Sequence, residues 1–161
     1  MKHLIPALLC TVALLCACQR NNTVFDETHT FNGNNWNRFT PEQFEIDVPN
    51  AEDYYNIDFT VSIDTSVYRY KEFPLMVIMT SPAGEERQFY HTIILNEKGR
   101  WRGEVHDGLR TVQGRVRSYF TFNRKGTHTM LVSQTTSQYD LEGIHSLQVT
   151  VDKTKLEYNL D

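Results

Sequence analysis

The most restrictive feature of this sequence is a period-two alternation of apolar and polar residues that returns along the chain. In residues 57–63, every odd position is Ile, Phe or Val and every even position is Asp, Thr or Ser. Residues 44–48, 111–122 and 147–151 alternate in the same way. Because successive side chains of a strand point to opposite faces, each stretch is predicted to be a strand with one buried and one solvated face.

Turn-forming residues separate these stretches. Asn, Asp, Pro and Gly gather at residues 49–53, 81–84 and 96–99, which suits hairpins between neighbouring strands. Residues 75–79 are apolar at every position, and this predicts a central strand covered on both faces. Helical periodicity is lacking, so we expect an all-β fold of about eight strands. An antiparallel β-sandwich, jelly-roll or immunoglobulin-like, fits this pattern best, and a closed barrel is the alternative.

The N-terminus has the layout of an export signal. Lys2 is followed by residues 4–15, which are apolar apart from one Thr. This run is too short to span a bilayer as a helix. The run ends in Leu15-Cys16-Ala17-Cys18, in which a small residue precedes Cys18 and a branched apolar residue stands three positions before it. This is the pattern of a lipobox, the cleavage site of a lipoprotein signal peptide.

Cys18 is the predicted lipidation site. Cys10 and Cys16 are each preceded by leucine and therefore do not fit the cleavage pattern. The alternative is an ordinary secretory signal with an incidental cysteine. These three are the only cysteines in the sequence, so the domain that follows must fold without an internal disulfide.

The predicted organisation is simple. Residues 1–17 form the signal peptide, residues 18–30 the lipidated cysteine and a polar tether, and residues 31–161 one β-sandwich domain. A first edge strand is expected near residues 28–31. The net charge is −4 with both signs spread along the chain, which suggests neither nucleic acid nor an anionic surface as a partner.

The sequence offers no pattern typical of catalysis or metal binding, so we expect no enzyme activity, no cofactor and no metal. The histidines after the leader are not spaced to meet on one metal from one element: they are His29, His91, His106, His128 and His145. His106-Asp107 is the nearest approach to a site. Neither a nucleophilic elbow nor a free thiol is present in the domain, and paired carboxylates in loops are most simply solvated surface.

Aromatic residues in and near the predicted loops suggest a binding surface. They are Trp36, Tyr54, Tyr55, Tyr68, Tyr70 and Trp101. Such rings can stack on sugars, which makes a carbohydrate-binding module the alternative function, although tryptophans in a disulfide-free domain more often fill the core. Residues 68–71 (Tyr-Arg-Tyr-Lys) and the face of Arg115 and Arg117 are candidates for protein contacts, with a solvated face as the simpler interpretation.

A series of motifs resembles the GldH family of gliding-motility lipoproteins found in the Bacteroidetes. After the lipobox they are Val-Phe-Asp-Glu at 24–27, Asn-x-Trp at 34–36, a strand ending in Asp64-Thr65, Tyr-x-x-Phe-Pro-Leu at 70–75, Pro-x-Gly at 82–84, Gly-x-Trp-x-Gly at 99–103, and Leu-Glu-Gly-Ile with an alternating strand at 141–151. Their serial order carries the resemblance, which covers nearly the whole chain after the leader.

The resemblance implies a non-enzymatic envelope lipoprotein that contacts the gliding or secretion machinery or other envelope proteins. Surface-exposed lipoproteins of this phylum are expected to carry acidic residues directly after the lipidated cysteine. Here residues 19–22 read Gln-Arg-Asn-Asn. We therefore expect an outer-membrane protein that is anchored through acylated Cys18 and faces the periplasm.

Overall fold

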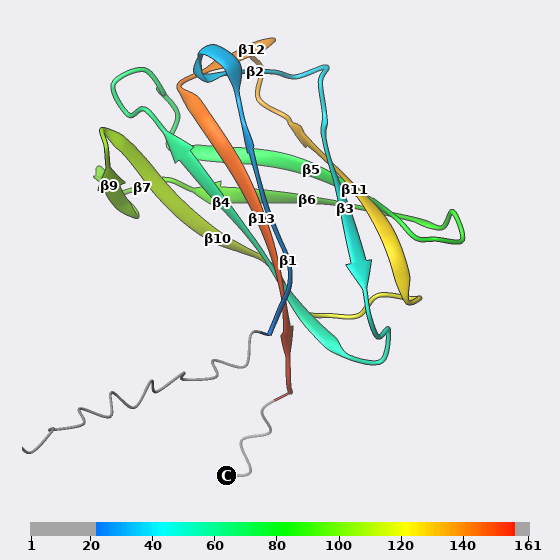
Figure 1. Cartoon of the computed structure of the whole chain (residues 1–161). Helices are drawn as coiled ribbons and strands as arrows, with labels where there is room; N and C mark the ends of the chain where they lie inside the picture. The colour runs from blue at the N-terminus through cyan, green and yellow to red at the C-terminus, as the bar shows by residue number, and fades with distance from the viewer. Residues whose placement is uncertain (1–21, 157–161) are drawn as a thin grey trace, which may run out of the picture.

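The computed structural model describes residues 22–156, which form antiparallel sheets and one short 3-10 helix (Figure 1). The larger sheet contains, in order, β1 (Thr23–Thr30), β13 (Ile144–Thr154), β4 (Tyr54–Ile63), β10 (Leu109–Phe120) and β9 (Glu104–His106). The second contains β3 (Glu42–Val48), β11 (Gly126–Gln134), β5 (Glu72–Thr80) and β6 (Glu86–Ile94). The short elements are η1 (Asn32–Asn34), β2 (Asn35–Asn37) paired with β12 (Asp140–Glu142), and β7 (Asn96–Glu97) paired with β8 (Arg100–Trp101).

The long strands pair in a nested order. β1 pairs with β13, β3 with β11, β4 with β10 and β5 with β6, and every pair is antiparallel. The two large sheets face each other, with β1 beside β3 at one lateral edge and β10 beside β6 at the other. The long strands therefore form two separate sheets, and the single closed barrel considered as an alternative does not describe them.

The core lies between the two sheets and follows the alternation in the sequence. The apolar positions of residues 44–48, 57–63 and 147–151 are all buried, and their polar neighbours point outward. Burying one such side chain contributes roughly 1.5–3 kcal/mol. One continuous cluster joins residues from both sheets, so a single core supports the all-β fold expected from the sequence.

The predicted count of about eight strands was too low, because the described residues form thirteen. Five of these strands, β2, β7, β8, β9 and β12, have only two or three residues each. Such short pieces cannot show an alternation of their own. They exist because the chain between longer strands happens to run beside another segment.

The predicted tether was too long. Residues 23–30 were assigned to it, with an edge strand only near residues 28–31, but β1 already begins at Thr23. β1 pairs along its length with β13, including the pair His29 with Leu147. Its sequence concealed this, because three consecutive residues in its middle are exposed and no clear alternation marks an edge strand.

Two other expectations need correction. β5 is a central strand between β11 and β6, but only one of its faces is buried: Met76 and Ile78 on the outer face are half-exposed. In β10, the inward face predicted to include Ser118 and Phe120 is lost after Val116. The pairing of β10 with β4 shifts register twice there, and Tyr119 adopts a φ of 52°, so the alternation breaks.

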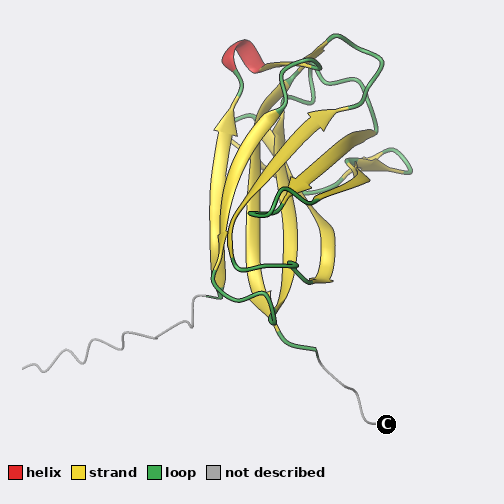
Figure 2. Cartoon of the chain, turned by 90° about the vertical axis from the view of Figure 1, so that its right-hand side faces the viewer, coloured by secondary structure: helices red, strands yellow, loops and turns green. Residues whose placement is uncertain are grey.

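The two ends of the domain differ in character. β1 begins and β13 ends at the same end, which we call the entry end (Figure 1). There Lys153 forms an ion pair with Asp53 at 2.6 Å. The opposite end, which we call the far end, carries η1, β2, β12 and the β4–β5 loop of residues 64–71 (Figure 2). Among the described residues, no helix has the length and apolar character needed to cross a membrane.

Candidate interaction surface

The far end displays a cluster of exposed aromatic rings. Phe39 is 71% exposed and Tyr139 is 64% exposed, and their ring centroids lie 5.6 Å apart. The Arg38 guanidinium carbon lies 5.7 Å from the Phe39 centroid and 5.8 Å from that of Tyr139. Tyr and Arg are enriched among the residues that dominate protein–protein binding, so we call these three residues the aromatic cluster and consider it a candidate contact surface.

A tight turn after β2 holds Phe39 outward. The Thr40 N–H donates to the Asn37 carbonyl at 3.0 Å, and the Phe39 N–H donates to the Asn37 side-chain oxygen at 2.9 Å. Beneath the turn, the indole N–H of buried Trp36 donates to the Thr40 carbonyl at 2.8 Å. Buried Trp36 therefore holds the turn from inside the domain, and the turn in turn holds Phe39 in its exposed position.

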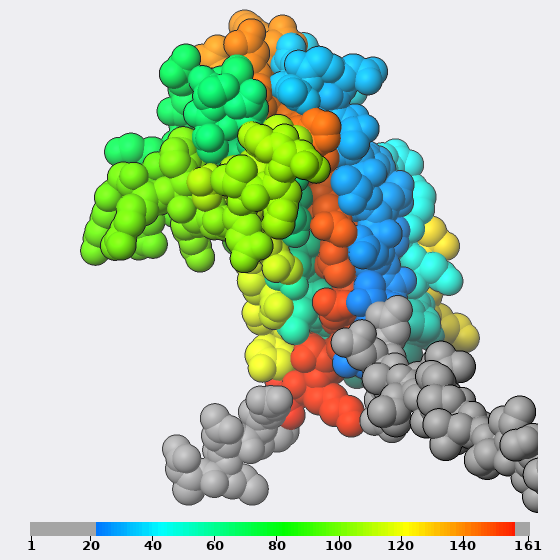
Figure 3. All heavy atoms as spheres, turned by 60° about the vertical axis from the view of Figure 1, so that its left-hand side comes forward, coloured from blue at the N-terminus to red at the C-terminus, as the bar shows by residue number. Residues whose placement is uncertain are grey.

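Next to the cluster lies a groove of about 260 Å³. It is lined by Val67, Arg69 and Tyr70 of the β4–β5 loop and by Gln138, Asp140, Leu141 and Glu142 in and next to β12. We call it the β12 groove. In Figure 3, β12 (orange) lies at this end between the residues around β2 (light blue) and those of the β4–β5 loop (green). The groove is open and its rim is charged, unlike the enclosed apolar pockets that hold small molecules.

The β4–β5 loop is held by hydrogen bonds among its own polar groups. The Asp64 carboxylate accepts hydrogen bonds from the Ser66 N–H at 2.9 Å and the Ser66 hydroxyl at 2.6 Å, and these bonds lower the pKa of Asp64. Tyr68 is buried, its hydroxyl donates to the Glu72 carbonyl at 2.9 Å, and its burial raises its pKa. With Tyr68 fixed inside, Arg69 stands on the groove wall.

The other side of the groove is also braced from within. Gln134 is buried, and its side-chain oxygen accepts bonds from the Thr136 N–H at 2.9 Å and the Thr136 hydroxyl at 2.6 Å. Its amide N–H donates to the Gln138 carbonyl at 3.0 Å. Leu141 is buried beneath the groove, and the side chains on either side of it in β12 are exposed. The shape of the groove thus depends on buried groups rather than on its rim.

The aromatic residues singled out in the sequence take other roles. Trp36, Tyr55 and Tyr68 are buried, and Tyr54, Tyr70 and Trp101 are half-exposed. Trp36 stacks on Phe31 with centroids 4.7 Å apart, so it presents no face to a sugar. The carbohydrate-binding alternative loses this part of its support.

The two exposed rings of the aromatic cluster are not among the residues that the sequence pointed to. Phe39 and Tyr139 were not singled out, although Asn37 and Pro41 bracket the first of them with turn-forming residues. That bracket was the available signal for a displayed ring. No comparable signal marks Tyr139.

The two other predicted contact sites have different roles in the structure. Arg69 and Lys71 are exposed, and Arg69 lines the groove as expected of a contact residue. Arg115 and Arg117 instead serve the fold. Arg115 forms an ion pair at 2.5 Å with Asp58, whose side chain is only 5% exposed, and the Arg117 guanidinium lies 3.8 Å from the Phe89 ring centroid.

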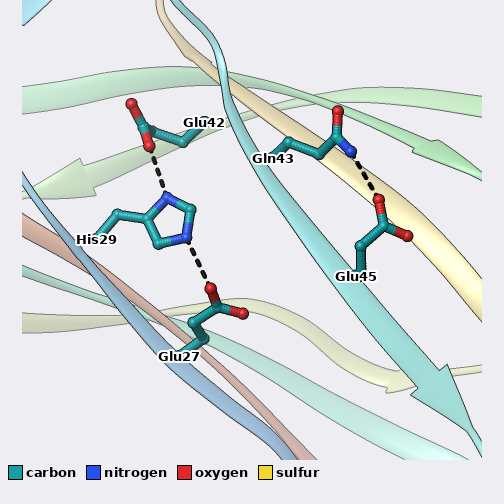
Figure 4. Close-up of polar contacts among 5 residues, drawn as sticks. All are labelled: Glu27, His29, Glu42, Gln43 and Glu45. Atoms are coloured by element: carbon teal, nitrogen blue, oxygen red, sulfur yellow. Dashed lines mark hydrogen bonds and ion pairs between the residues drawn. The ribbon is translucent and has the colours of Figure 1, made fainter.

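The five histidines lie on five different strands, and the side chain of His106, the nearest approach to a site, forms an ion pair with Glu104 at 3.4 Å. His29 bridges the two sheets at the lateral edge (Figure 4). Its Nδ1 lies 2.6 Å from Glu42 on β3 and its Nε2 lies 2.9 Å from Glu27 on β1. Burial lowers the pKa of His29, but the hydrogen bonds to Glu42 and Glu27 outweigh that effect and raise it.

Within residues 22–156, two other histidines have shifted pKa values, but no metal-binding group is found. No group of three or more His, Cys, Asp or Glu side chains in this range is placed to hold a metal ion. Burial is the main effect that lowers the pKa of His91 and of His128, and nearby arginines add to it. Cys18, the predicted lipidation site, lies outside the described residues.

These observations describe an all-β domain that carries a candidate contact surface at one end. Over residues 23–151, which is most of the chain, the sequence matches the family described as GldH lipoprotein. The chain belongs to the GldH lipoprotein family. This makes it an envelope-associated, lipid-anchored protein of the gliding-motility type. No curated protein and no solved structure matches the chain.

Proposed function

We propose that this protein is an outer-membrane lipoprotein, anchored through acylated Cys18 and facing the periplasm, which acts without catalysing a reaction by binding other envelope proteins. The gliding or secretion machinery is the expected partner. The nested strand pairing supports a jelly-roll sandwich, and we include this fold type in the proposal. The family supports an anchored envelope protein, and the sequence after Cys18 supports the periplasmic face.

The aromatic cluster carries this proposal. Two large exposed rings and a partly exposed arginine lie together at the far end, while β1, the first described strand after the proposed anchor, begins at the entry end. A lipid anchor therefore leaves the cluster pointing away from the membrane, toward soluble or neighbouring proteins. Apolar groups exposed together in one patch mark interaction sites more often than singly exposed residues do, and a partner would cover this patch.

In-cell crosslinking tests the proposal. A photo-crosslinking residue at Tyr139, in the anchored protein, should capture defined envelope-machine components. The same residue at Tyr90, which is also exposed but lies on β6, is the matched control. The Cys18→Ala form, left unanchored, should lose the capture. If the purified protein binds polysaccharide and no envelope protein is captured from Tyr139, the proposal is wrong.

A further inference from the structure

The β12 strand has a free edge that faces the groove. In the described part of the chain, β12 pairs with β2 and with no other strand. On the β2 side, the Tyr139 carbonyl accepts from the Arg38 N–H at 2.8 Å, and the Gly143 N–H donates to the Asn34 carbonyl at 2.8 Å. In an antiparallel pair, successive residues direct their backbone N–H and C=O groups alternately toward the neighbouring strand and away from it. Because Tyr139 and Gly143 direct these groups toward β2, the even-numbered residues of β12 direct theirs away from β2 and into the groove.

We propose that the β12 groove receives an extended segment of a partner protein, which pairs with this free edge as an added strand. The inference rests on the proposed function and specifies how the partner is held. A row of backbone donors and acceptors at a strand edge is the recognition element of β-strand addition. The main chain of the partner supplies affinity, and its alternating side chains supply selectivity.

The side chains of β12 define the chemistry of that segment. Leu141 points inward and is buried, whereas Asp140 and Glu142 are exposed on the outer face. Directly opposed residues of neighbouring strands share a face, and opposite charges there attract. The partner segment should thus carry basic residues at alternate positions, with apolar residues between them that pack toward Leu141 and Tyr70.

The opposite wall completes the site. Arg69 stands there on a loop that is fixed by buried Tyr68 and by the Asp64 turn. A guanidinium has five N–H donors and no acceptor, so Arg69 can donate to carbonyl groups on the outer edge of the added strand. The aromatic cluster continues the surface beyond Tyr139, which immediately precedes β12.

The described ends of the chain lie away from this groove. β1 begins and β13 ends at the entry end (Figure 1), whereas the groove lies at the far end. The occupant that we propose is therefore a segment of another protein.

A peptide-binding measurement on the full-length lipidated protein in detergent tests the proposal. The probe is a short fluorescent peptide of alternating Lys and Val, and the matched probe replaces each Lys with Glu. Fluorescence anisotropy should detect the basic peptide and not the acidic one. Glu142→Lys should weaken binding about tenfold or more, and Glu86→Lys, which reverses an exposed carboxylate on β6, should leave it unchanged.

Backbone methylation separates strand pairing from simple charge attraction. One peptide carries N-methyl groups at alternate residues, which removes the backbone N–H donors along one of its edges. A second peptide carries them at the intervening residues, which removes the donors along the other edge. One of the two should lose about tenfold or more in affinity while the other binds as well as the unmodified peptide. Equal binding of both methylated peptides, equal binding of the acidic probe, or no binding at millimolar concentration overturns the proposal.

This outcome can be told apart from failure of the proposed function. If the peptides fail but crosslinking from Tyr139 still captures envelope components in cells, strand addition is wrong and the adaptor function stands. If both fail, both proposals are wrong. A sedimentation measurement completes the set, because self-association that is lost in Glu142→Lys would assign the groove to a second copy of this chain and overturn the heterologous partner.

Discussion

Gly143 is the residue on which the geometry of the groove depends most directly. It follows β12 and adopts a φ of 84°, in the left-handed region that favours glycine. A Cβ at this position would lie 2.6 Å from the Tyr68 backbone nitrogen. The β4–β5 loop can approach β12 only because Gly143 has no side chain.

We predict that Gly143→Ala lowers the free energy of unfolding by about 3 kcal/mol or more, because left-handed strain and a backbone clash add together. Gly84→Ala is the control. Gly84 has a similar φ of 80°, but a Cβ there would meet no other atom within 4 Å, so the substitution should cost about 1 kcal/mol. Urea unfolding measures both, and equal losses would contradict the assigned contact.

His29 gives a second prediction at the residue scale. Its pKa in the fold is raised above the ordinary value of 6.5, so its bonds to Glu42 and Glu27 contribute fully below pH 6.5 and weaken as the pH rises through the raised pKa. His29→Gln should therefore cost about 1–2 kcal/mol at pH 6 and less at pH 9. Urea unfolding across this pH range measures the loss, with exposed His106→Gln as the control. A loss of unfolding free energy in His29→Gln that grows with pH would contradict the prediction.

Among the elements, β10 shows how a strand can use charged side chains on its outer face. The Arg115 side chain forms an ion pair with Asp58 on β4, and the carboxylate of Asp58 is almost completely buried. Arg115→Met should lower the free energy of unfolding by about 2 kcal/mol, because it leaves a buried carboxylate without its cation. Arg124→Met, which disrupts a contact of 4.0 Å between exposed groups, should cost less than about 0.5 kcal/mol. Thermal or urea unfolding compares the two.

The sequence was a good guide to strands that bury one full face and a poor guide elsewhere. In β4 the apolar positions from Ile57 to Ile63 are all buried, because period two and burial coincide there; Asp58 on the outer face is buried as well, where it pairs with Arg115. β10 departs from its pattern after Val116 because its register depends on β4, which no local sequence encodes. Trp36 was placed near a loop, correctly, but its burial depends on Phe31 and Phe73, which approach it only in the folded domain.

At the scale of the whole molecule, one continuous core should hold the fold without help from metal or disulfide. We predict a β-type far-UV circular dichroism spectrum and an unchanged thermal transition when chelator and reductant are added. The reason is that both sheets contribute to the same buried cluster. A helical spectrum, or a transition lost on adding chelator, would contradict this.

A second prediction at this scale concerns attachment. Radiolabelled fatty acid should enter the wild-type protein and not Cys18→Ala, and only the wild type should sediment with membranes. Two or three acyl chains, each methylene contributing about 0.8 kcal/mol, make the attachment effectively permanent. Label that persists in Cys18→Ala would contradict the assignment.

The strand order could not be deduced from the sequence, since nested pairing brings together residues as far apart as Thr23 and Asp152. The groove could not be predicted from the sequence for the same reason. Its walls come from residues 67–70 and 138–142, which have no common motif. Of the residues that line it, the sequence pointed only to Arg69 and Tyr70 as contact candidates, through their residue types and not through their position; Leu141 and Glu142 entered only as part of the family resemblance.

The pairing of β1 with β13 has a mechanical consequence. If the protein is held by lipid near Thr23 and by a partner at the far end, tension enters along the axis of β1. The ladder bonds of an antiparallel pair lie perpendicular to the strands, so such a load shears them all together instead of unzipping them one at a time. Under the proposed function, the domain would therefore resist a load applied along the line from its lipid anchor to its partner.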